Sequence, residues 1–190
     1  MKVLFRTIVT LLLLAVIACG LVIWYISPDQ KLDLSYRDID VKAKAVQMLK
    51  TRKPEITLSG SELNELAKKE LLKHLGDIPR QITVTGAEFH FSGQEVTADI
   101  NGKYEDLIPF GAKLKFYMEA NGSTLELQHE STQIKAIKIP ASQLKLGTIT
   151  VQLKDHLPDM LTVDHIEFLP DGAKLSFKLD WMSLPSLLLK

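Results

Sequence analysis

The stretch Ile8–Ile26 reads IVTLLLLAVIACGLVIWYI, a run of nineteen residues without a charged side chain. A helix of this length spans roughly 28 Å, which matches the hydrocarbon core of a bilayer, and it satisfies its own backbone hydrogen bonds there. The residues that follow are polar enough to form a water-soluble body. The sequence therefore predicts one hydrophobic anchor and a folded body that this anchor holds at a membrane surface.

Charged and aromatic residues around the apolar run predict its orientation. Lys2 and Arg6 precede the run without any acidic residue, which predicts a cytoplasmic N-terminus. Trp24 and Tyr25 lie at the other end, where amphipathic rings favour the interface between lipid and water. We therefore expect a single-pass protein of the cell membrane, with residues 1–26 as cytoplasmic tip and transmembrane anchor and with an extracytoplasmic body.

The same apolar residues also fit a cleaved signal sequence. Val16–Gly20 reads VIACG, which matches the lipobox of bacterial lipoproteins and would make Cys19 the lipid-modified N-terminus. Leu21–Ile26 stays apolar, however, whereas a polar tether usually follows a lipid-modified cysteine. The uncleaved span is the preferred interpretation, and a lipoprotein anchored at Cys19 is the alternative. Both place the body on the same side of the membrane.

The composition of the body excludes several classes of protein. All 23 acidic residues lie beyond the anchor, together with all of the 23 basic residues except Lys2 and Arg6. A body so close to neutral lacks the basic surface that a nucleic-acid partner requires. Cys19 is the single cysteine, which excludes a disulfide, a cysteine nucleophile and a thiolate metal centre in the body.

A polar linker over residues 27–37 is predicted to join the anchor to an extracytoplasmic α+β domain over residues 38–190. The linker has no pattern of its own, and we expect it to carry the domain a short way off the membrane. Apolar side chains recur near helical spacing over Asp38–Lys50, which predicts an amphipathic helix at the start of the domain.

A second helix begins with a clear local signal. Ser59 stands three residues before Glu62, the spacing of a capping box, and leucines then form one stripe. The pattern predicts a helix over Gly60–Leu75, ended by Gly76 in the left-handed conformation. Asn64 follows an inward-facing leucine, so its amide is expected to hydrogen-bond a strand backbone and fix the helix on the sheet.

From Gln81 onward apolar and polar residues alternate, which predicts antiparallel strands with one buried and one solvated face. Hairpin turns are predicted at three dipeptides: Ser92-Gly93, Asn101-Gly102 and Asn121-Gly122. A last hairpin over Val163–Trp181 turns at Pro170–Gly172. The expected fold is α+β, with an N-terminal transmembrane helix followed by one or two helices packed on a curved antiparallel β-sheet of about six to eight strands.

Catalytic and metal-binding motifs are absent from the sequence. The five histidines form no H-x-x-x-H or H-E-x-x-H spacing: His74, His90, His129, His156 and His165. No nucleophile stands at a useful spacing from a base, and the chain has no P-loop or dinucleotide fingerprint. We therefore predict that the protein is not an enzyme and uses no cofactor and no metal.

Several motifs resemble a known family. Behind the anchor come ITLSGSELNEL (56–66), IPFGAKLKFYM (108–118), IPASQLKLGTITVQL (139–153) and VDHIEFLPDGAKLSFKLDW (163–181). They resemble the YpmS-like family of membrane-anchored proteins of Gram-positive bacteria. The start of the first motif is also similar to bacterial envelope proteins likened to the tubular lipid-binding superfamily. That second resemblance implies a capped helix packed against a long, curved sheet, and it transfers no catalytic residue.

The leading functional expectation is a membrane-tethered extracytoplasmic binding protein that holds a lipid or another hydrophobic ligand between helix and sheet. The candidate ligand-lining residues are apolar positions of the predicted helix and strands: Leu63, Leu66, Leu71, Phe89, Phe91, Leu114, Phe116 and Phe177. The alternative is a protein–protein interaction module of the cell envelope without a small ligand. The apolar tail Leu184–Leu189 and the open edges of a sheet motivate that alternative. The expected partners are the membrane, through Ile8–Ile26, and either a hydrophobic ligand or an envelope protein.

Overall fold

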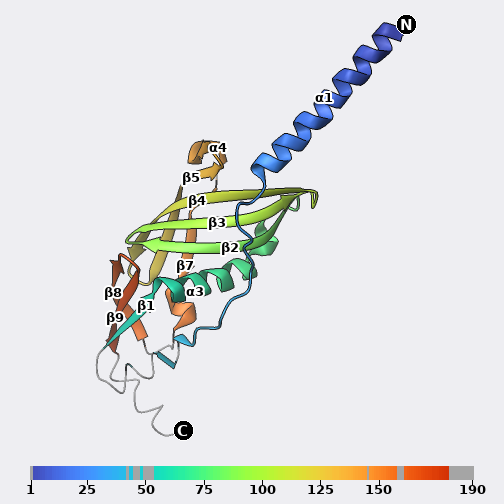
Figure 1. The fold of residues 1–190 in the computed structure, drawn as a ribbon. Coiled ribbons are helices and arrows are strands. Elements are labelled where there is room, and N and C mark those ends of the chain that lie inside the picture. The colour runs from blue at the N-terminus through green and yellow to red at the C-terminus, as the bar shows by residue number, and fades with distance from the viewer. Residues whose placement is uncertain are drawn as a thin grey trace.

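The computed structural model describes residues 2–41, 43, 44, 48, 54–144, 146–157 and 161–179. The first helix, α1 (Lys2–Ile26), stands away from the body (Figure 1). Its apolar segment Phe5–Ile26 is 22 residues long and has no part buried inside the protein, so it is consistent with a membrane anchor or a signal sequence. The amide and the hydroxyl of Ser27 donate to the carbonyl oxygen of Ile23 over 3.1 and 2.7 Å, which satisfies the end of the helix.

A three-stranded sheet forms the part of the body farthest from α1. Its order is β1-β9-β8, and all pairs are antiparallel: β1 (Glu55–Ser59), β9 (Gly172–Leu179) and β8 (Leu161–Leu169). Its apolar face forms one core cluster, which includes Ile56, Leu58 and Phe177. The predicted last hairpin is confirmed over Leu161–Leu179, whereas Trp181 and the tail Leu184–Leu189 lie outside the described residues.

A six-stranded antiparallel sheet forms the larger layer. Its strands are β2 (Ile82–Ser92), β3 (Glu95–Tyr104), β4 (Ile108–Asn121), β5 (Thr124–Ile134), β6 (Ile137–Pro140) and β7 (Ile149–Gln152). They pair in the order β2-β3-β4-β5-β6, and β7 also pairs with β5. The sheet curves, so that β7 passes behind β2 and β3 in Figure 1. The predicted α+β fold with an N-terminal apolar helix is thus confirmed, with its strands divided between two sheets.

The predicted capping box is present in α3 (Gly60–Lys73). The amide of Glu62 donates to the Ser59 hydroxyl over 3.3 Å, and the amide of Ser59 donates to the Glu62 carboxylate over 3.1 Å. Lys44 Nζ lies 2.6 Å from the same carboxylate and, as its strongest partner, lowers the pKa of Glu62 below the ordinary value. The helix start is therefore tied to the segment before β1.

The prediction of a left-handed cap at Gly76 is wrong. The helix ends at Lys73, and Gly76 lies in the short 3₁₀ turn η1 (Leu75–Asp77) without a positive φ. The amides of His74 and Asp77 donate to the carbonyl oxygens of Leu71 and His74, each over 3.0 Å. Because the tightened turn satisfies the final carbonyl groups, no left-handed residue is needed.

The predicted helix over Asp38–Lys50 falls partly outside the described residues. Within it, Val41, Ala43, Lys44 and Met48 are helical. The Asp40 carboxylate accepts a hydrogen bond of 2.8 Å from the Ala43 amide, as an N-cap residue does. The helix therefore starts after Asp40, later than the pattern predicts.

Two of the three predicted hairpin dipeptides are turns, and the third is not. Gly93 and Gly122 both have a φ of 59° in their turns. Asn101 and Gly102, however, lie inside β3, and the hairpin closes at Glu105 and Asp106 instead. Asn101 Nδ2 donates to the carbonyl oxygen of Gln30 over 2.6 Å. A Cβ at Gly102 would lie 2.6 Å from the ring of Phe110. The dipeptide therefore serves two tertiary contacts.

Two short elements connect the strands at the end of the chain. The helix α4 (Ala141–Leu144) follows β6, and the 3₁₀ turn η2 (Leu153–His156) follows β7. The large sheet carries a second core cluster around Val96, Ala98, Phe116 and Met118. Leu125 and Phe168 pack against both clusters and so join the two sheets.

Candidate functional site

The two faces of the six-stranded sheet differ sharply in polarity. Because side chains alternate along a strand, the cross-strand register places one apolar set on a single side. We call this set the apolar face, and it comprises Ala87, Phe89, Phe91, Val96, Ala98, Ile100, Phe110, Leu114, Phe116, Met118, Leu125 and Leu127. The opposite face carries mainly polar positions, among them Glu88, His90, Asp99, Asn101 and Lys113.

The apolar face is only partly covered. Phe89, Phe91, Ile100, Leu114, Leu125 and Leu127 remain half-buried around the buried residues of the cluster. Among the described residues, the largest side chain with less than 2 % exposure is that of Val96. Along α3, all of whose residues are described, only Gly60 is buried. A close-packed interior would enclose the large side chains of such a face, so helix and sheet together leave apolar surface open to solvent.

Seven of the eight residues predicted to line a ligand site divide between the two core clusters. Phe89, Phe91, Leu114 and Phe116 all belong to the apolar face. Leu63, Leu66 and Phe177 belong to the core cluster of the three-stranded sheet, and Leu71 is a half-buried residue of α3 outside both clusters. The structure thus brings the four sheet residues together and assigns three of the others to packing.

His129 is a polar residue on the apolar face, opposite Phe116 in the register. The two rings lie 5.5 Å apart, and His129 Nε2 lies 2.9 Å from the Thr132 hydroxyl. Its second ring nitrogen, Nδ1, is buried and has no hydrogen-bond partner among the described residues. Such an atom is costly to leave unpaired. Alternation alone assigned no role to this histidine.

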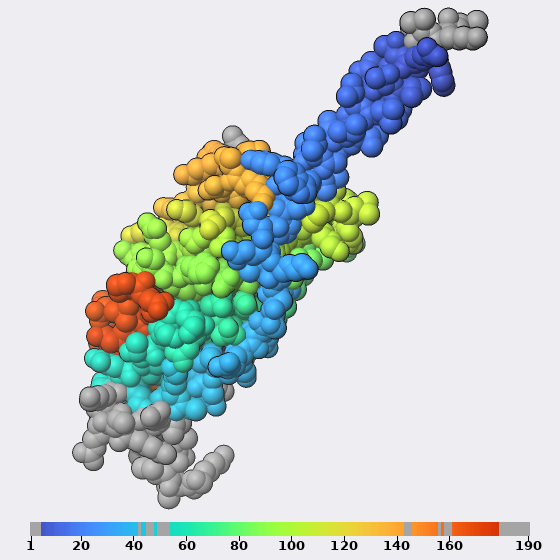
Figure 2. Space-filling view, viewed as in Figure 1, coloured from blue at the N-terminus to red at the C-terminus, as the bar shows by residue number. Residues whose placement is uncertain are grey.

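The linker lies across the polar face instead of standing free (Figure 2). A Cβ at Gly111 in β4 would lie 3.0 Å from Pro28, and a Cβ at Gly86 in β2 would lie 2.2 Å from the carbonyl oxygen of Leu32. Between them, Asn101 in β3 holds Gln30. The linker therefore runs over β4, β3 and β2 in turn, and glycines admit its backbone where it passes closest.

Beyond the sheet the linker continues along α3. The Arg37 amide donates to the Glu65 carboxylate, and Lys69 Nζ lies 2.5 Å from the Asp38 carboxylate. The chain between α1 and the first residues of the domain is thus attached at both the sheet and the helix.

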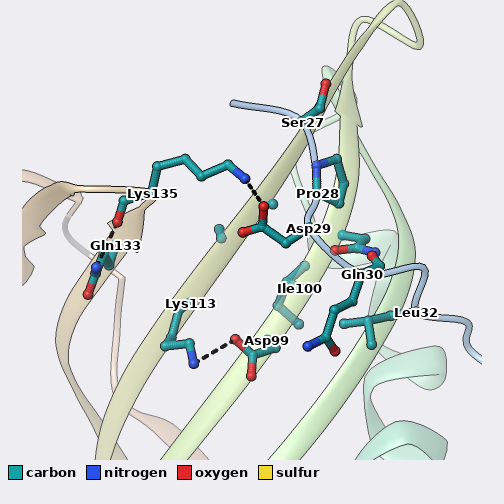
Figure 3. A pocket seen from close by; sticks show the side chains of 13 residues that line it. Ser27, Pro28, Asp29, Gln30, Leu32, Asp99, Ile100, Lys113, Gln133 and Lys135 are labelled. Carbon is teal, nitrogen blue, oxygen red and sulfur yellow. Dashed lines mark hydrogen bonds and ion pairs between the residues drawn. The ribbon is translucent and has the colours of Figure 1, made fainter. Parts of the chain in front are cut away.

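A polar pocket of about 280 Å³ lies between the linker and the sheet (Figure 3). Lys135 reaches across it to pair with Asp29, and Lys113 Nζ lies 3.2 Å from the Asp99 carboxylate. The pair of Lys135 and Asp29 joins the linker to the turn between β5 and β6, whereas the pair of Lys113 and Asp99 joins β4 to β3. A second pocket, of about 490 Å³, lies between the β4–β5 turn and β8. None of the eight predicted ligand-lining residues lines either pocket.

The edge of β2 that does not pair with β3 is contacted by the linker and α3. The amide of Ala87 donates to the carbonyl oxygen of Asp33 over 3.2 Å, and the amide of Phe89 donates to Asn64 Oδ1 over 2.8 Å. The predicted role of Asn64 is therefore confirmed. Strand edges with unpaired amides invite pairing with another chain, and these two contacts occupy the middle of that edge.

The residues that hold the linker were missed by reading the strands for alternation alone. Gly86 and Gly111 interrupt otherwise regular strands, and a glycine inside a strand often marks the close approach of another backbone. That signal identifies the positions, although it does not identify the segment that approaches them. Only the folded chain assigns the contact to residues 28–33.

Within the described ranges, no group of three His, Cys, Asp or Glu side chains is placed to hold a metal ion. The remaining distinctive feature is the partly exposed apolar face on a body whose first helix is suited to a membrane. No protein-family model, no curated protein and no solved structure matches the chain.

Proposed function

We propose that the protein is a membrane-tethered binding protein that holds a hydrophobic ligand, such as a lipid acyl chain, on the apolar face beside α3. The observation that carries this proposal is the combination of large apolar side chains and incomplete burial on one side of the sheet. Binding sites for small hydrophobic molecules are lined by such side chains with few polar groups among them.

We also propose the location of this body. In the proposal α1 is an uncleaved single-pass anchor, the N-terminus is cytoplasmic and the body is extracytoplasmic, on the charge and aromatic pattern around the run. The lipoprotein alternative at Cys19 leaves the body on the same side. Membership of the YpmS-like family is proposed on the sequence motifs alone.

A crosslinking experiment tests the proposed ligand. The full chain is produced in living bacteria with the photoreactive amino acid p-benzoylphenylalanine in place of Phe89. Phe89 is half-buried on the apolar face. The matched control carries the same photoreactive amino acid at His90, the exposed neighbour that points to the opposite face. After irradiation, intact-mass spectrometry is expected to find an adduct of lipid mass at position 89 and none at position 90. Equal adducts at both positions, or none at position 89, would refute the proposed ligand.

The alternative of a protein–protein module has less support from the described residues. The tail Leu184–Leu189 that motivated it lies outside them, and the middle of the edge of β2 is occupied. The same crosslinking experiment tests this alternative, since an adduct of protein mass at position 89 would favour a protein partner over a lipid.

A further inference from the structure

The β3–β4 hairpin ends in apolar side chains that project from the body. Leu107 is 82 % exposed, Tyr104 is 49 % exposed and Ile82 is 36 % exposed, whereas Ile108 beside them is half-buried. Ile82 pairs with Tyr104, and Tyr104 pairs with Ile108, so these side chains form one row across three strands. We call Ile82, Tyr104, Leu107 and Ile108 the hairpin tip. Single exposed apolar residues are common on proteins, whereas a contiguous exposed group indicates a contact surface.

The turn at the tip is fixed in place by hydrogen bonds. The amide of Leu107 donates to the carbonyl oxygen of Tyr104 over 3.1 Å, and Glu105 and Asp106 between them have φ values of 50° and 57°. This is a type I′ turn built without glycine. The hydroxyl of Thr83 donates to the Asp106 carboxylate over 2.6 Å. The side chain of Leu107 therefore projects from a defined turn.

The tip lies at the end of the sheet where α1 is attached. Pro28, two residues after the end of α1, sits against Gly111 of β4. Gly111 comes four residues after Leu107 and ten residues before Asn121 at the other end of β4. At about 3.3 Å per residue, the tip is about 13 Å from this attachment point and the opposite turn about 33 Å. In Figure 1 the turn between β3 and β4 lies beside the C-terminal end of α1.

We propose that the hairpin tip rests in the interfacial layer of the membrane that holds α1. The transfer of leucine and isoleucine side chains out of water lowers the free energy. A tyrosine ring with its hydroxyl favours the boundary between lipid and water. The carboxylates of Glu105 and Asp106 are exposed beside them, so the contact is shallow and these charges stay among the headgroups. Because apolar side chains drive the contact, it does not require anionic lipids. This inference rests on the proposed role of α1 as the anchor.

Site-specific fluorescence tests the contact. The full chain is reconstituted into phosphatidylcholine vesicles, with and without phosphatidylglycerol, and carries the fluorophore NBD on one cysteine. In a Cys19→Ala background the cysteine is placed by Leu107→Cys or, as the matched control, by Asn121→Cys in the turn at the far end of β4. Leu107 is largely exposed, so its replacement removes little packing. The otherwise unchanged chain labelled at Cys19 reports whether α1 is embedded.

The expected result is a blue-shifted emission at position 107 that headgroup-level nitroxide lipids quench, in both vesicle compositions, with water-like emission at position 121. Embedding of Cys19 together with identical water-like spectra at positions 107 and 121 overturns the inference and leaves the anchor intact. Water-like emission from Cys19 overturns the anchor and the inference together. A shift at position 107 that appears only with phosphatidylglycerol also overturns the inference, because an electrostatic contact would then be responsible.

Discussion

The substitution Gly86→Ala is expected to detach the linker from the sheet. The new Cβ would lie 2.2 Å from the carbonyl oxygen of Leu32, whereas real Cβ contacts shorter than 3.0 Å are essentially never seen, so the linker must move by close to 1 Å. That movement breaks the hydrogen bond from the Ala87 amide to Asp33 and strains the neighbouring bond from Asn101 to Gln30.

The expected cost follows from these contacts. Each lost hydrogen bond costs about 1 kcal/mol, and replacing a strand glycine by alanine otherwise gains roughly 0.5–1 kcal/mol. With both hydrogen bonds lost, we expect a net loss of about 1–1.5 kcal/mol in the free energy of unfolding. Gly76→Ala is the matched control, since a Cβ there has no neighbour within 4 Å and its backbone is not left-handed. Its stability should change by less than about 0.5 kcal/mol.

Two measurements on the full chain in detergent micelles check this prediction. Urea unfolding followed by circular dichroism gives the change in stability, and hydrogen exchange read by mass spectrometry should show faster exchange in peptides covering residues 28–36 and in β2. If Gly86→Ala instead stabilises the protein and leaves exchange over residues 28–36 unchanged, the linker does not lie on the sheet and the reasoning fails.

Two further predictions concern α3. Asn64→Leu removes the acceptor of the Phe89 amide and should lower the free energy of unfolding by about 1–3 kcal/mol; Asn64→Asp keeps an acceptor oxygen, and a loss as large in that variant, measured by urea unfolding, would contradict the assignment. The Asp77 carboxylate, followed by that of Glu70, raises the pKa of His74 above its ordinary value of 6.5. The charged imidazole therefore stabilises the folded state fully below pH 6.5, and this contribution is lost as the pH rises through the folded-state pKa; an NMR titration should place the pKa of His74 lower in Asp77→Asn, and an unchanged value would refute the pairing.

Local sequence signals determined the elements whose stability depends on near neighbours. The apolar run up to Ile26 is helical, the capping box starts α3 after Ser59, and alternation identifies the strands and their apolar side. Helix caps and strand periodicity are set by residues a few positions apart, so they can be read in order along the chain. The role of Asn64 was also predictable, because an amide next to an inward-facing leucine lies close to the sheet, where a strand backbone can pair with it.

Tertiary contacts decided the features that the local pattern misassigned or left open. Asn101-Gly102 has the composition of a turn, yet the approach of the linker and of Phe110 keeps it inside β3. Likewise, alternation identifies the apolar face but does not determine how much of it another layer covers. The sequence therefore predicted part of the candidate site: the alternation of apolar and polar residues along the strands identifies which residues form the apolar face. The exposure of the apolar face, the path of the linker over the polar face and the position of the hairpin tip depend on segments far apart in sequence. Contacts between distant segments produce no local sequence pattern, so the sequence did not predict them.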